Sequence, residues 1–203
     1  MNSPKIVAEY ISCLSILEEN TSLIYSALSE RVESPAQIKS LLLSISQDSL
    51  KHSKLLKDTA NKISHSKAKR GDCAKNLGKV WRTMNNCLSE ATKKEIGTRD
   101  FSMLLSMLDG LESSLLEEYY NFVQTKTLQL MVNEINNLYD ISLASINKVF
   151  ETIIRDEERH REILGNIKDI IGDASTEDNT LSVKYQNPDS WITSMPPATY
   201  DSI

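Results

Sequence analysis

The sequence is poor in the residues that interrupt helices or build turn-rich folds. No proline lies between Pro35 and Pro188, only 6 of the 203 residues are glycine, and aromatic residues make up 6% of the chain. A proline inside a helix removes a backbone donor and clashes with the preceding turn, so a long proline-free stretch favours helices. The low glycine and aromatic content argues against a β-sandwich. We therefore expect an all-α protein.

Cysteines and long apolar runs are also scarce. The three cysteines, Cys13, Cys73 and Cys87, form no C-x-x-C pair, which excludes a rubredoxin-type or zinc-ribbon site built from them alone. We expect reduced thiols in a cytoplasmic protein. No apolar run approaches the roughly 18 residues that span a bilayer, and the N-terminus leads into no signal-peptide core, so we expect no membrane partner. The net charge of -5 argues against a nucleic-acid partner.

Apolar residues that recur every three or four positions predict the helices. We expect four main helices and a shorter one over about 73–95. The first two long helices cover about 4–30 and 35–63. The third begins near residue 100 and runs through 122, and the apolar pattern continues beyond Thr127 to Gly172 with a break near Asn136 that separates the third helix from the fourth. The four long helices form a bundle over residues 1–172, in which about 64–98 is an inserted connection with its short helix. Proline and polar residues after 172 predict an extended C-terminal arm over 173–203.

Two of the expected helices carry the same polar pattern. Asp48–Leu56 matches Asp156–Leu164 in its leading acid, its base, its histidine and its closing apolar residues. In the second segment, Glu157 and His160 are three residues apart, about 60° around a helix axis, so they can bind one ion from one face. The first segment keeps its histidine, His52. The pattern predicts a polar site inside the bundle.

The other two long helices also repeat each other. Glu18 precedes Tyr25 by seven residues, and Glu112 precedes Tyr119 by seven. Glu18 lies in an apolar stripe, where an unpaired carboxylate is costly unless a metal ion or another partner neutralises it. Glu118 lies in as apolar a stripe as Glu112, so either one can face inward. The opposite face of the first helix is polar and is expected to face solvent: Ser12, Ser15, Glu19, Ser22, Ser26 and Ser29.

With these motifs the chain resembles the ferritin-like superfamily, most closely its rubrerythrin-type members. In that family, glutamates from two helices and a Glu-x-x-His pair from each of the other two hold a di-iron or di-manganese centre. The resemblance implies a ferritin-like four-helix bundle with an inserted shorter helix and an extended C-terminal tail. It also implies metal ligation by five residues: Glu18, His52, Glu112, Glu157 and His160.

The sequence departs from the family pattern in two places. Where the family has a glutamate three residues before the second-helix histidine, this chain has Ser49, and the neighbouring Asp48 or water is the expected replacement. We therefore expect an asymmetric site. The chain also lacks the rubredoxin-like four-cysteine segment of full rubrerythrins, and with it their built-in electron relay.

The resemblance implies a metal-binding protein whose carboxylate and histidine site holds iron, with two ions expected and manganese or zinc as alternatives. The implied chemistry is redox reaction with oxygen or peroxide, of the peroxidase or ferroxidase type, or iron handling. The competing hypothesis is a helical oligomerising or binding protein with an incomplete or empty metal site. We also expect a homo-oligomer with the C-terminal arm at its interface.

Overall fold

The structure is a computed structural model of the 203-residue chain. It describes residues 4–32, 35–64, 68, 70–93, 96–126 and 143–176, and these residues form helices and no strand, which confirms the all-α prediction. Met1–Ile167 is one compact unit and Lys168–Ile203 a second, and every interaction described below lies within the first. No helix in the described ranges is long and apolar enough to cross a membrane.

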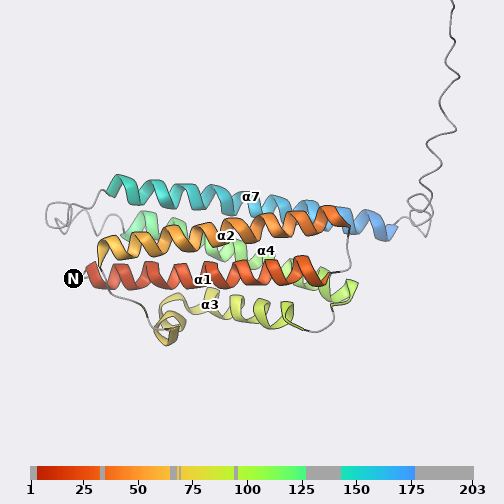
Figure 1. Ribbon diagram of the computed structural model, residues 1–203, viewed down its shortest axis with the longest axis horizontal. Helices are drawn as coiled ribbons and strands as arrows, with labels where there is room; N and C mark the ends of the chain where they lie inside the picture. Colours follow the sequence, from red (N-terminus) through yellow and green to blue (C-terminus); the bar gives the residue numbers. More distant parts are fainter. Residues whose placement is uncertain are drawn as a thin grey trace, which may run out of the picture. The chain divides into compact units, whose positions relative to one another are not determined.

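The helices fall where the apolar periodicity places them (Figure 1). They are α1 Pro4–Arg31, α2 Ala36–Ile63, α3 Arg70–Ala91, α4 Thr98–Asn121 with its π-helical continuation η1 Phe122–Lys126, and α7 Leu143–Thr176. α7 continues to Thr176, past Gly172, which is the expected end of the bundle. The break expected near Asn136 and the arm beyond residue 176 lie outside the described residues.

Serine side chains hold α1 and α2 together as an antiparallel pair. Ser15 Oγ donates to the Ser53 carbonyl at 2.9 Å, and Ser46 Oγ donates to the Ser22 carbonyl at 2.9 Å. Small side chains let two helices approach closely, since interaxial distance depends on the residues at the contact. Ser15 and Ser22 are therefore buried, and the prediction that they face solvent is wrong. Their hydroxyls find partners on the neighbouring helix instead of in water.

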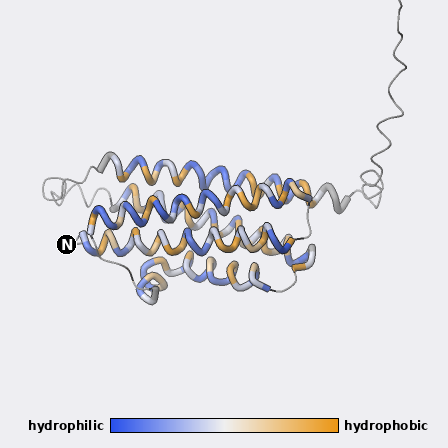
Figure 2. Tube along the Cα trace, in the orientation of Figure 1, coloured by the Kyte–Doolittle hydropathy of each residue, from blue (hydrophilic) through white to orange (hydrophobic). Residues whose placement is uncertain are grey.

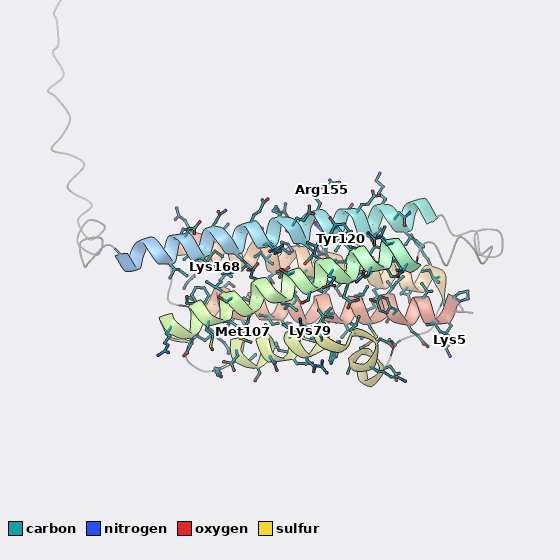
Figure 3. The ribbon with its side chains drawn as sticks, turned by 180° about the vertical axis from the view of Figure 1, so that it is seen from behind. Lys5, Lys79, Met107, Tyr120, Arg155 and Lys168 are labelled. Carbon is teal, nitrogen blue, oxygen red and sulfur yellow. A yellow bond between two sulfur atoms is a disulfide. The ribbon has the colours of Figure 1, made fainter. Side chains whose placement is uncertain are left out.

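α1, α2, α4 and α7 lie side by side, and Figure 3 brings α4 to the front. Tyr10 on α1 donates to Glu118 on α4, and Phe122 after α4 stacks on Phe150 of α7 with ring centroids 4.1 Å apart. On the outer surface Tyr120 of α4, labelled in Figure 3, donates to a glutamate of α7. Apolar and polar residues alternate along each helix, as Figure 2 shows, because one face of each helix is buried and the other is not.

The shorter helix α3 packs on α1 and α4. It is kinked at Gly78, whose φ of 46° is a left-handed value that favours glycine. A disulfide between Cys13 and Cys73 joins α1 to α3, with the two Cα atoms 5.1 Å apart. The expectation of three reduced thiols is therefore wrong for this pair, which is 60 residues apart in sequence. Cys87 is a free thiol and is buried.

Candidate metal centre

Five ionisable side chains meet in the interior between α1, α2, α4 and α7. They are Glu18, His52, Glu112, Glu157 and His160, and each has an exposed fraction of 0%. Ionised groups taken out of water cost several kcal/mol each unless they are paired, so a gathering of five is unusual for a structural core. The structure thus brings together all five residues that the sequence analysis names as metal ligands.

The five residues form two overlapping groups of potential ligand atoms. Glu18, His52 and Glu157 form one group, and Glu112, Glu157 and His160 form the other. Within each group, one ligand atom per residue lies within 4.8 Å of the others. Glu157 belongs to both groups, and the two imidazole rings face each other with centroids 5.9 Å apart. The arrangement offers two neighbouring positions for cations with one shared carboxylate.

Many polar atoms of the cluster lack a hydrogen bond. His52 Nδ1 lies 3.2 Å from Glu157 Oε1, and His160 Nδ1 lies 3.3 Å from Glu112 Oε2. The first of these contacts has ion-pair distance but lacks hydrogen-bond geometry. Within the part of the chain that the structure describes, no hydrogen-bond partner is present for His52 Nδ1, either Glu157 oxygen or Glu18 Oε2. A buried polar group without a partner costs about 1–3 kcal/mol. A bound cation would give these atoms the partner that the folded chain does not.

Burial and mutual repulsion determine the protonation of the cluster. Burial, followed by the charges of Glu18 and Glu112, raises the pKa of Glu157 well above its usual range. Burial also opposes ionisation of Glu112, but His160, together with Glu157 and the hydrogen bond from Tyr25, outweighs it and lowers the pKa of that carboxyl. Likewise the pKa of His52 is raised, because its contacts with Glu18 and Asp156 together outweigh the effect of burial. Of the carboxyl groups in the metal-free cluster, Glu157 is therefore the one whose surroundings most oppose ionisation.

Two buried tyrosines hold the glutamates in a crosswise arrangement. Tyr25 Oη donates to Glu112 Oε1 at 2.5 Å, and Tyr119 Oη donates to Glu18 Oε1. Each tyrosine therefore bonds the glutamate of the other helix, not the one seven residues before it. Burial, followed by the nearby carboxylates, raises the pKa of both phenols, so they stay protonated and act as donors. The tyrosines fix one oxygen of each glutamate. Of the other two oxygens, Glu18 Oε2 has no hydrogen-bond partner among the described residues, and Glu112 Oε2 lies 3.3 Å from His160 Nδ1.

A carboxylate on the outer side of His52 orients its ring. His52 Nε2 lies 3.0 Å from Asp156 Oδ2, which also accepts a hydrogen bond from Lys51 Nζ at 2.7 Å. Partial burial opposes ionisation of Asp156, but Lys51 and His52 outweigh it and lower the pKa of its carboxyl to about 2. With its proton on Nε2, the imidazole directs the Nδ1 lone pair at the cluster, as metal-binding histidines do. A signal for this role is present in the sequence, because Asp156 is the leading acid of the repeated segment.

Asp48, the expected replacement for the missing ligand, lies on the outer side of His160. Its Oδ2 is 3.6 Å from His160 Nε2 and pairs with Arg159, while Oδ1 accepts from Lys51. Neither group of potential ligand atoms includes Asp48. Partial burial opposes its ionisation, but Lys51 and Arg159 outweigh that effect and lower the pKa of its carboxyl.

The structure distinguishes Glu112 from Glu118. Glu112 is fully buried in the cluster, whereas Glu118 is half-buried and accepts a hydrogen bond from Tyr10. Helix geometry explains the difference, since six residues along a helix correspond to a rotation of about 240°.

Comparison of the chain with protein-family models, with curated proteins and with solved structures finds no match.

Proposed function

We propose that this chain is a ferritin-like, rubrerythrin-related four-helix bundle that holds two iron ions in its buried cluster for redox chemistry with oxygen or peroxide. The observation that supports the proposal is the set of five fully buried glutamates and histidines in two overlapping groups, with several ligand atoms lacking any other partner. A solvated helix face or a salt-bridged core would not leave carboxylate oxygens of this kind without partners.

The donor set fits a pair of divalent first-row metal ions. Glu18 and His52 would hold one ion, Glu112 and His160 the other, and Glu157 lies within reach of both. Mixed carboxylate and imidazole ligands suit iron, and also manganese and zinc. Iron bound there supplies the electrons that reduce oxygen or peroxide.

The residues of the chain prepare the site for these ions. Asp156 holds the proton of His52 on Nε2, and the two tyrosines fix one oxygen of each terminal glutamate. Because the five donors are fully buried, bulk water is excluded from them. Glu157 loses its proton when cations enter, since a cation stabilises the ionised carboxylate far more than the buried metal-free site does.

Metal content and an optical spectrum test the proposal. The full-length protein is purified without chelator, stripped of metal, supplied with ferrous iron under anaerobic conditions, analysed for iron, and then exposed to air. We expect about two irons per chain and an oxidised-iron absorption band. Glu112→Gln should lose most of the iron, whereas Glu118→Gln, on the same helix but outside the cluster, should keep it.

The opposite result would support the competing function, a helical oligomerising or binding protein with an empty site. The observation in its favour is Ser49, which puts a hydroxyl where a carboxylate ligand is expected. Negligible iron uptake by the native protein would favour that alternative over the di-iron site. Equal iron uptake by the Glu112 and Glu118 variants would show that Glu112 does not hold iron.

A further inference from the structure

The polar contacts around the cluster occur in matched pairs that exchange α1 with α4 and α2 with α7. The pairs are Tyr25 with Glu112 and Tyr119 with Glu18, then His52 with Asp156 and His160 with Asp48. Lys51 and Arg159 follow the same exchange, because each pairs with the aspartate of the other helix. The site therefore has an approximate two-fold symmetry in its contacts.

One position breaks this symmetry. Glu157 follows Asp156 directly, so its counterpart after Asp48 is Ser49. Ser49 has an exposed fraction of 0%, and its Oγ has no hydrogen-bond partner. It lies three residues before His52, on the face of α2 that is turned toward the cluster. The same place thus lacks a carboxylate and contains an unpaired donor.

The charges of the metal-loaded cluster indicate what kind of group binds beside Ser49. Two divalent cations bring four positive charges, and the three carboxylates of Glu18, Glu112 and Glu157 bring three negative ones. The imidazoles are neutral when they bind metal. One uncompensated positive charge would remain in a fully buried site, and a buried unpaired charge is strongly unfavourable. A single monoanion beside Ser49 would neutralise it.

The size of the group that is missing at position 49 follows from a comparison of the side chains. Serine Oγ takes the place of the glutamate Cγ, so the group missing at position 49 is the terminal carboxylate itself. Formate is that carboxylate with a hydrogen in place of the carbon chain, and its oxygens can accept a hydrogen bond from the unpaired Ser49 hydroxyl. We propose that the metal-loaded protein binds a small monocarboxylate of about the size of formate beside Ser49, opposite Glu157. This inference rests on the proposed di-metal function.

Cobalt(II) is a suitable probe, because its visible absorption reports changes in its ligands. The metal-free full-length protein is loaded with cobalt in a carboxylate-free buffer and titrated with sodium formate, sodium acetate or sodium benzoate. Formate should change the cobalt spectrum in a saturable manner, and acetate should do so too if the place beside Ser49 admits one more methyl group. Benzoate is much larger than the carboxylate that is missing at position 49 and should leave the spectrum unchanged.

Substitutions at position 49 locate the anion. Ser49→Ala keeps the space but removes the donor, and it should weaken formate binding about tenfold or more, the usual effect of a lost hydrogen bond to a charged group. Ser49→Glu supplies its own carboxylate and should bind cobalt without responding to formate. Ser46→Ala is the matched control: Ser46 is also buried on α2, but its hydroxyl already pairs with Ser22, so formate affinity should be unchanged.

The outcomes separate this inference from the proposed function. No cobalt uptake by the native protein refutes the metal site itself. Cobalt uptake without a formate response, an equal response to benzoate, or unchanged formate affinity in Ser49→Ala refutes the anion site alone. If Ser49→Glu does not fold, the comparison of Ser49→Ala with Ser46→Ala still decides the question.

Discussion

Replacing Glu157 by glutamine should stabilise the metal-free protein while it abolishes metal binding. In the metal-free cluster both Glu157 oxygens are fully buried without hydrogen-bond partners, and Glu18 and Glu112 repel the ionised form. Glutamine has almost the same shape, carries no charge and provides N–H donors for the neighbouring carboxylates. An ordinary core substitution has the opposite effect on stability, since most changes in a packed interior destabilise.

The expected gain at pH 8 is about 2 kcal/mol, because the native protein must either ionise this buried carboxyl or take up a proton to keep it neutral, and glutamine requires neither. For a chain of this length that gain corresponds to a rise in Tm of about 4–8 °C. The gain should depend on pH. Because the folded-state pKa of Glu157 is raised, the folded protein binds this proton more tightly than the unfolded chain, so its contribution to stability falls as pH rises above the unfolded pKa. Near pH 4 both states are protonated, and the advantage of glutamine should be small.

Urea unfolding of chelator-treated protein at pH 4, 6 and 8 measures this difference. Glu158→Gln is the matched control, because Glu158 is the next residue, is exposed, and accepts a hydrogen bond from Tyr120 at the surface. The control should stay within about 0.5 kcal/mol of the native protein at every pH. If Glu157→Gln destabilises the protein at pH 8, or changes its stability equally at all three pH values, the carboxylate has a satisfying partner and the reasoning about the cluster fails.

Three further predictions concern groups around the cluster. Reducing the Cys13–Cys73 disulfide should lower the free energy of unfolding by about 4 kcal/mol in the loop-closure model for a 60-residue separation, as measured by urea unfolding with and without reductant; an unchanged midpoint would contradict it. Cys87 should react very slowly with iodoacetamide at pH 8 in the folded metal-free protein and rapidly in urea, since burial raises the pKa of its thiol to about 12; fast labelling of the folded form would show that it is accessible. Asp156→Asn should weaken metal binding about 10–100-fold in a competition titration, whereas Asp109→Asn, which removes a surface ion pair with no histidine, should leave it unchanged; equal affinities would exclude a positioning role for Asp156.

Much of the fold and the candidate site could be predicted from the sequence, because both depend on periodicity and repetition. The repeated Asp-x-x-basic-His pattern placed His52 and His160 in equivalent positions, and the structure brings them together. The disulfide could not be predicted, since its cysteines lie 60 residues apart on helices whose relative register the sequence does not define. The burial of Ser15 could not be predicted either, because a serine facing water and a serine bonded to a neighbouring backbone look alike in a hydropathy pattern.

The crosswise tyrosines explain why the two repeated halves form one unit and not two separate hairpins. Tyr25 on α1 satisfies Glu112 on α4, and Tyr119 on α4 satisfies Glu18 on α1. Within one half alone, each glutamate would keep the tyrosine of its own helix, but the two side chains would be seven residues, or about two turns, apart. Each half therefore contributes a donor that only the other half can use. The buried carboxylates, which oppose folding when they stand alone, in this way make the assembly of the halves specific. Their second oxygens face the shared site, where Glu112 Oε2 contacts His160 and Glu18 Oε2 has no hydrogen-bond partner among the described residues.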